Sequence, residues 1–164
     1  MKSVTQIARR FGIQYSRRSA NVTYEWDGRT LALRVGGSQH GPIERRSSSH
    51  VVHDIAHWLI APPERRSIPD FGLGPVGDGA SALSLPAVVT RSVALEEESM
   101  ASILGIALEL EAGLNWTATH ENHNWPDISI ASRQRVIDQI HDLGFSRHIN
   151  DEETLQAILR HNYY

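Results

Sequence analysis

The segment His53-Asp54-Ile55-Ala56-His57 has the residue types and the spacing of a metal site. Residues four apart in a helix lie on one face about 6 Å apart, so two imidazoles at this spacing can reach one ion. Neutral imidazole binds zinc, iron, nickel and copper. Asp54 occupies the position where the glutamate of a His-Glu-x-x-His zinc hydrolase acts as general base on metal-bound water, which makes Asp54 a candidate catalytic residue.

This pattern alone has low specificity, because about one in twenty chains of this length with nine histidines contains it by chance. The competing interpretation is a pair of hydrogen-bonded histidines in the core. The surrounding residues favour the metal site, since two histidines on an apolar helix are costly to bury unless something satisfies them. That apolar helix is predicted from Val51, Val52, Ile55, Ala56, Leu59 and Ile60.

A third ligand is expected from Glu96-Glu97-Glu98, near the start of a second predicted helix. Acidic residues in a first turn are ordinary, because they complement the helix dipole. Glu97, however, is in phase with the apolar stripe of that helix and is expected to point inward, and Glu98 borders the stripe. We favour Glu97 as the third metal ligand, with Glu98 next, and His50 is a further candidate one turn before the first histidine.

The pair Arg65-Arg66 follows the proline pair that ends the histidine helix. An arginine at this position could hold a carboxylate or phosphate of a substrate. We expect both arginines to line the mouth of the site and to act on substrate rather than on folding, although a solvated pair is an equally good explanation. His120 and His123 lie in a polar stretch and carry less weight as a second site.

The predicted elements give an α+β fold. Residues 23–26 and 30–35 have β-type composition and flank Asp27-Gly28, which is typical of a hairpin. We expect a small antiparallel sheet with this hairpin, packed against four to five helices, and a metal site between the two central helices. Those helices are predicted over residues 4–11, 51–60, 92–112, 129–143 and 151–161, with an irregular connection over 61–87.

Composition indicates one globular domain over residues 1–164, with 40% hydrophobic and 21% charged residues. The chain has no cysteine, which excludes disulfides, thiolate zinc sites and iron–sulfur clusters, so a metal must bind His, Asp or Glu. The N-terminal residues lack the apolar run of a signal peptide, and no stretch approaches the length of a membrane span. We therefore expect a cytoplasmic protein without membrane contact.

The charge is distributed unevenly along the chain. Residues 1–66 carry 11 Lys/Arg and 5 Asp/Glu, whereas residues 67–164 carry 5 and 14. The basic N-terminal half could bind an acidic protein or a nucleic-acid-associated substrate. Attraction between the two halves within one fold is the simpler explanation.

The run His53-Asp54-Ile55-Ala56-His57-Trp58 and its continuation to residue 72 resemble the elongation factor P hydroxylase family. In that family a His-Glu-Ile-Ala-His-Trp segment leads through an Ala…Arg-Arg stretch to an acidic-aromatic-glycine turn, and a glutamate-bearing helix follows. The similarity spans residues 50–112. It implies a compact α+β metalloprotein with a two-histidine, one-carboxylate site, formed here by His53, His57 and either Glu97 or Glu98.

The chain departs from the family at Asp54, where the family has glutamate, and at Leu73-Gly74, where it has further aromatic residues. We favour a metal-dependent hydroxylase or oxygenase, an oxidoreductase acting on a protein side chain. One divalent transition metal is expected, with iron favoured and zinc as the alternative.

Three other functions stay open. The first is a zinc-dependent hydrolase, of peptidase or ribonuclease type, that uses Asp54 as general base. The second is a phosphohydrolase in which adjacent His and Asp both bind metal, with His40 or His50 and Asp70 or Asp78 as additional ligands. The third is a non-enzymatic binding module that uses the basic half.

Overall fold

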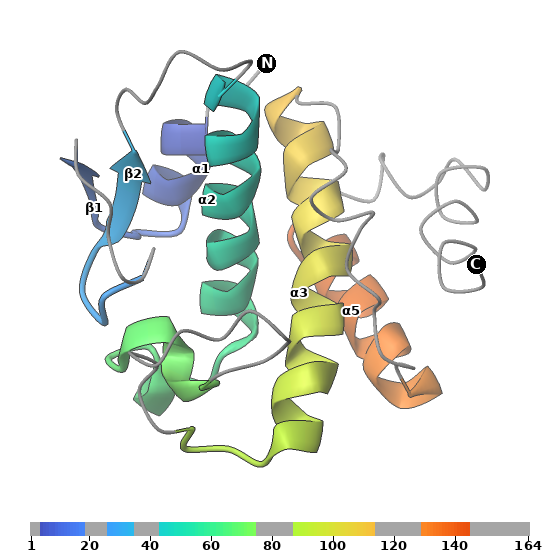
Figure 1. Ribbon diagram of the computed structural model, residues 1–164. Helices are drawn as coiled ribbons and strands as arrows, with labels where there is room; N and C mark the ends of the chain where they lie inside the picture. The colour runs from blue at the N-terminus through green and yellow to red at the C-terminus, as the bar shows by residue number, and fades with distance from the viewer. Residues whose placement is uncertain (1–3, 19–25, 35–42, 75–86, 114–128, 145–164) are drawn as a thin grey trace.

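The computed structural model describes residues 4–18, 26–34, 43–74, 87–113 and 129–144, and these residues are predominantly helical. No helix among them combines the length and apolar character needed to cross a membrane. In chain order the elements are α1 (Val4–Arg10), β1 (Tyr15–Arg18), β2 (Leu31–Arg34), α2 (Ile43–Ile60), the short 3₁₀ turns η1 (Pro63–Arg65) and η2 (Pro69–Gly72), α3 (Arg91–Ala112) and α5 (Ile130–Asp142) (Figure 1).

The predicted α+β fold with a small antiparallel sheet is wrong. β1 and β2 pair in parallel, with Tyr15 opposite Leu31 and Arg18 opposite Arg34, and they form the whole sheet found in the described residues. Two strands of four residues are a minor part of a fold built on helices.

The predicted hairpin turn does form, which explains how the prediction went wrong. Trp26 makes an antiparallel bridge to Leu31, and an Asp27 side-chain oxygen accepts the backbone N–H of Thr30 at 2.7 Å. The backbone N–H of Leu31 is donated to Gln14, so the strand after the turn pairs with the chain that follows α1. The residues of a turn indicate that the chain reverses direction there, but they do not indicate with which strand the segment after the turn will pair.

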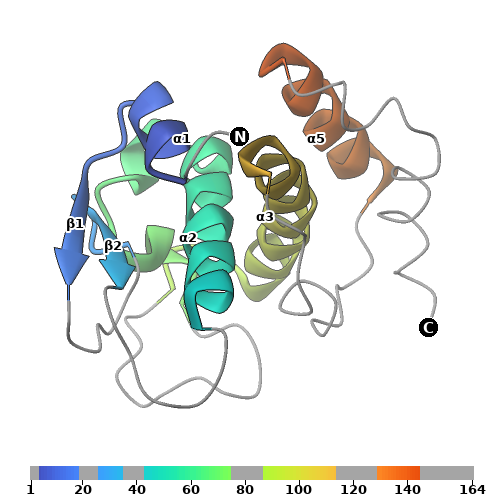
Figure 2. The same ribbon diagram turned by 90° about the horizontal axis from the view of Figure 1, so that it is seen from above.

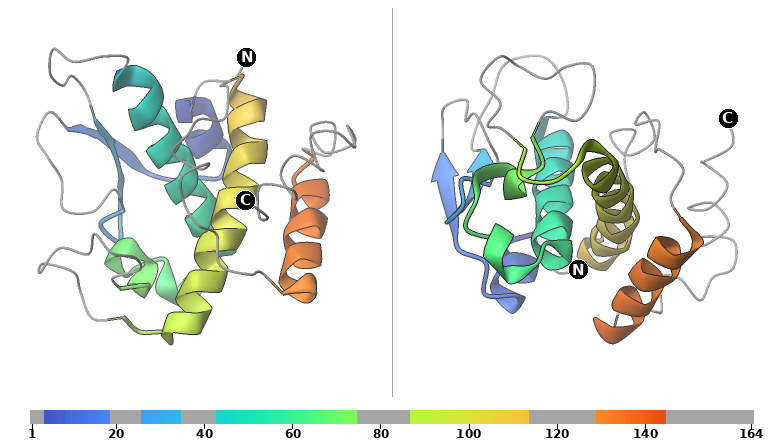
Figure 3. Two further views of the ribbon diagram at one scale, coloured as in Figure 1. Left: turned by 45° about the vertical axis from the view of Figure 1, so that its right-hand side comes forward. Right: turned by 90° about the horizontal axis from the view of Figure 1, so that it is seen from below.

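Helices α2 and α3 run antiparallel at the centre of the molecule (Figure 1). Seen from above, α1 and the two strands lie on one side of this pair and α5 lies against α3 on the other (Figure 2). The two views of Figure 3 show the strands, α2, α3 and α5 in the same order, with the 3₁₀ turns at the end where α2 leads into α3. α3 is buried around most of its circumference because it has helices on both sides.

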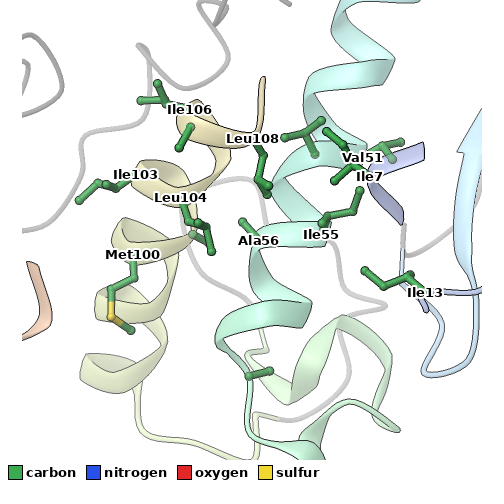
Figure 4. Packing of buried hydrophobic residues seen from close by; sticks show 14 of the residues in the cluster. Ile7, Ile13, Val51, Ile55, Ala56, Met100, Ile103, Leu104, Ile106 and Leu108 are labelled. Carbon is green, nitrogen blue, oxygen red and sulfur yellow. The ribbon is translucent and has the colours of Figure 1, made fainter. Parts of the chain in front are cut away.

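The core fills the space between α2 and α3 with aliphatic side chains (Figure 4). Ile55, Ala56 and Leu104 are completely buried in it. Thr90 caps the start of α3 by accepting the N–H of Val93, and left-handed Gly113 ends the helix, which confirms the predicted span of 92–112.

Of the other predicted helices in the described residues, two are confirmed and one begins earlier than expected. α5 confirms the helix expected over 129–143, but α2 begins at Ile43, eight residues before the predicted start. α1 confirms the helix expected over 4–11. The helix expected over 151–161 lies outside the described residues.

The segment after α2 is held by the turn that contains Gly28. The backbone N–H of Asp70 is donated to the Trp26 carbonyl at 3.0 Å, and the Trp26 indole N–H is donated to the Arg66 carbonyl at 2.9 Å. Asp70 and Phe71 both adopt left-handed backbone angles, with φ of 51° and 53°. Two consecutive non-glycine residues in this region are strained, so the surrounding contacts must hold them there.

We expect Gly28→Ala to destabilise the protein more than Gly12→Ala does. Both glycines have positive φ, so both substitutions introduce backbone strain of about 1 kcal/mol. A Cβ on Gly28 would also lie 2.6 Å from the backbone oxygen of Ser67, whereas a Cβ on Gly12 meets nothing within 4 Å. Overpacking adds about 1–3 kcal/mol. Urea unfolding measures both variants, and equal losses would contradict the close packing of this turn on the segment after α2.

Candidate metal centre

Three potential ligand atoms converge between the end of α2 and the start of α3. His53 Nε2 and His57 Nε2 are 3.0 Å apart, and Glu98 Oε2 lies 3.1 Å from the first and 3.2 Å from the second. The two histidines are one helical turn apart on α2, and antiparallel packing brings the second turn of α3 opposite them. These three are the group of His, Asp and Glu residues in the described chain whose geometry suits a metal ion.

The spacing of these atoms fits a shared ion. Ligands bound at about 2.1 Å and at right angles to one another are about 3.0 Å apart, close to all three observed separations. The donor set of two imidazoles and one carboxylate leaves further positions open on a six-coordinate ion. The arrangement therefore meets the requirement for a metal site with access for other ligands.

The electrostatics of the group are those of an imidazolium–carboxylate cluster. Burial alone would lower the pKa of His57, but attraction to Glu98 and the nearby Glu97 and Asp54 carboxylates raises it to about 10. Burial alone would raise the pKa of Glu98, but His57 and His53 hold it well below the usual range. A metal cation at this position would replace the positive charge that the proton on His57 otherwise supplies.

The three consecutive glutamates of α3 have three different environments. Glu98 lies with the histidines, whereas Glu97 is 3% exposed and pairs with Arg65. Glu96 accepts hydrogen bonds from the hydroxyls of Ser129 and Ser132, which ties α3 to α5 and lowers its pKa. The geometry thus favours Glu98 as the third ligand, where the apolar phase of the sequence had favoured Glu97.

Asp54 lies next to the first histidine but outside the converging group. It is half-buried on α2, and its charge is the smallest of the influences that raise the pKa of His57. The side chain of His50 lies outside the described residues, as do His40, Asp78, His120 and His123.

Arg65 and Arg66 make contacts within the protein. Arg65 pairs with the buried carboxylate of Glu97 and donates to the carbonyl of Phe71 at 3.1 Å. The guanidinium of Arg66 lies 4.1 Å from the centre of the Trp58 ring, and its Nε donates to the carbonyl of Ala61 at 3.0 Å. These contacts favour a structural role, in contrast to the substrate-binding role expected from the sequence.

The sequence analysis did not assign Phe71 to the site. The ring of Phe71 stacks on His57 with centroids 5.6 Å apart and on Trp26 with centroids 5.7 Å apart. Burial raises the pKa of the adjacent Asp70 to about 6, with His57 opposing the rise and Glu98 adding to it. The aspartate–phenylalanine–glycine order was visible in the sequence, but the left-handed turn that brings Phe71 against the histidine was not.

Comparison with known proteins gives one match. A family model described as elongation factor P hydroxylase matches residues 45–163, which include all three converging residues. The match covers well over half of the chain, so the chain belongs to the elongation factor P hydroxylase family. No curated protein and no solved structure matches it.

We expect the metal-free protein to bind one transition-metal ion per chain, and His57→Ala and Glu98→Gln to abolish this binding. Each substitution removes one corner of the ligand triangle. Calorimetric titration with Co²⁺ or Zn²⁺ measures it, with circular dichroism to verify folding. Glu96→Gln is the matched control, because that carboxylate faces the serines of α5. Equal, near-zero binding by wild type and His57→Ala would contradict the site.

Metal affinity is also expected to rise with pH. The pKa of His57 in the metal-free protein is about 10, so metal binding at neutral pH must displace its proton. Because one proton is displaced, the apparent affinity rises about tenfold for each unit of increase in pH until the pH reaches that pKa. Titrations in buffers of different ionisation enthalpy count the released protons, and release of none would show that the metal does not bind His57.

We expect Arg65→Ala to lower stability strongly, since it leaves the buried charge of Glu97 without its partner. Breaking a buried ion pair in this way costs about 3–5 kcal/mol. Arg29→Ala is the control, because that arginine is exposed and exposed arginines contribute about 0–1 kcal/mol. Thermal unfolding of the two variants compares them. An unchanged melting temperature for Arg65→Ala, with activity lost, would restore the substrate-binding role.

Proposed function

We propose that this member of the elongation factor P hydroxylase family is a metal-dependent hydroxylase that acts on a protein side chain. The observation that carries the proposal is the convergence of His53, His57 and Glu98 inside the region that matches the family. The family's description names a protein substrate, elongation factor P, which is therefore the first substrate to test.

Iron is the metal proposed for this site. Two histidines and one carboxylate with open positions are the donor set of non-haem iron oxygenases, whereas structural zinc sites use four protein ligands. His53, His57 and Glu98 would hold the ion, and bound iron would supply the activation of oxygen. The chain has no cysteine to provide a thiolate ligand.

The protein's own residues would arrange the site around that ion. The histidines and Glu98 supply lone pairs from two packed helices, so their relative positions are fixed before an ion binds. Phe71 covers one face of the His57 ring and is itself completely buried, which keeps solvent away from that side. Asp70 adds a second carboxylate whose charge is felt by both His57 and Glu98.

The basic N-terminal half gives a reason to expect an acidic protein substrate. Arg9 and Arg10 are exposed at the end of α1, and Arg29 is exposed in the turn before β2. Exposed cationic groups speed the encounter with an acidic partner, and added salt weakens this effect by screening the charges.

The zinc hydrolase is the second candidate, and it depends on Asp54. Aspartate at this position is about 1.5 Å shorter than the family's glutamate, so a direct hydrogen bond to metal-bound water is harder to make. An oxygenase depends less on this residue, because a carboxylate here can act as support for a histidine. The His-Asp phosphohydrolase is less favoured, since Asp54 is not among the converging ligands.

We expect hydroxylation to require iron and to be inhibited by zinc, and Asp54→Asn to reduce it only modestly. A lost hydrolytic base would cost several orders of magnitude, about 10²–10⁴ or more in rate. Mass spectrometry of elongation factor P after reaction detects the added oxygen, with Glu98→Gln as the inactive control. Asp54→Glu restores the family's residue and tests whether the shorter acid limits the rate.

The opposite pattern would favour hydrolysis. Turnover of a peptide or RNA substrate with zinc alone, abolished by Asp54→Asn, would contradict the hydroxylase and support the hydrolase.

A further inference from the structure

We propose that Glu97 is a positioning residue that fixes the orientation of the His57 ring, and that Arg65 holds Glu97 in place. The inference rests on the proposed function, because it concerns a ligand of the proposed metal centre. It assigns a role to the buried ion pair of Arg65 and Glu97, neither of which belongs to the three converging ligands.

The two nitrogens of His57 face different carboxylates. Nε2 lies 3.2 Å from Glu98 and belongs to the ligand triangle, whereas Nδ1 faces Glu97 Oε1 at 3.8 Å. His57 and Glu97 are each 3% exposed. Neither Nδ1 nor Oε1 has a hydrogen-bond partner among the described residues.

Pairing these two atoms with each other removes two costs at once. A buried donor or acceptor left unsatisfied costs about 1–3 kcal/mol, and the two atoms are already 3.8 Å apart. A shift of less than about 1 Å brings them to hydrogen-bond distance. An Nδ1–H donated to Glu97 leaves the lone pair on Nε2 available to an ion, so this bond selects the tautomer that a metal requires.

Arg65 completes a closed ring of contacts around His57. Its guanidinium pairs with the other oxygen of Glu97 and donates to the carbonyl of Phe71, and the ring of Phe71 stacks on His57. The arginine therefore holds the carboxylate of Glu97 and the backbone of Phe71 in place beside the imidazole. A carboxylate and an aromatic face together leave the imidazole little freedom to turn.

The decisive measurement is the Nδ1 proton of His57 in nitrogen-15 NMR spectra of the metal-free and zinc-loaded protein. Wild type is expected to show a downfield, slowly exchanging Nδ1–H. The double variant Glu97→Gln with Arg65→Met removes both charges together, because a single substitution would leave one of them buried and unpaired. This variant should lose the downfield signal and bind Zn²⁺ about 10–100-fold more weakly.

Glu109→Gln is the matched control. Glu109 is a completely buried glutamate on the same helix, about 18 Å further along α3 at 1.5 Å per residue. Its substitution perturbs a buried acid without touching the site. We expect it to change the stability of the protein while the His57 signal and the Zn²⁺ affinity stay as in wild type.

The outcomes separate this inference from the proposed function. A folded double variant with an unchanged Nδ1–H signal and unchanged Zn²⁺ affinity would overturn the role of Glu97. A wild-type protein that binds no metal, but whose Nδ1–H signal in the metal-free state depends on Glu97, would uphold the positioning role and contradict the metal-dependent hydroxylase.

Discussion

Helices α2 and α3 bury ionisable side chains at one end of an aliphatic core, and the need to satisfy those groups governs this end of the molecule. His57 and Glu97 are almost completely buried, close to residues such as Ile55 and Ala101 that are wholly apolar and fully enclosed. A charge in such surroundings is tolerated when an opposite charge or a hydrogen bond accompanies it. The ion pair from Arg65 and the contact with Glu98 supply these partners, and the strained turn at Asp70 and Phe71 is part of the same arrangement.

The two histidines that converge with Glu98 could be singled out from the sequence more directly than the fold could. The spacing of His53 and His57 depends on the helical repeat alone, so it could be read directly. Assigning the third ligand required knowing how α3 is rotated about its own axis relative to α2. An error of one residue in that phase exchanges Glu97 for Glu98. Apolar periodicity reports which side of a helix is buried, but it does not report which buried position meets a given partner.

The error in the fold and the contacts of Arg65 that the sequence did not reveal have a common origin. Strand composition and the Asp27-Gly28 turn are local signals, whereas the pairing of β2 with β1 depends on where α1 delivers the chain. Arg65 was likewise interpreted only from its position after the prolines that end the histidine helix. Its partner Glu97 is 32 residues away and reaches it only through the packing of α3. Contacts between distant segments were the information that a single sequence lacked.

The three consecutive glutamates Glu96-Glu97-Glu98 contact three different parts of the protein. Their partners are, in order, α5, Arg65 and the histidines of α2. Each step along a helix turns the side chain by about 100°. Deleting Ser99, which lies between these glutamates and the buried residues that follow them on α3, would therefore turn all three carboxylates relative to the core and alter all three contacts together. Substituting one glutamate alters one of these contacts, whereas a change in the number of residues between the run and the core-facing part of α3 alters all three.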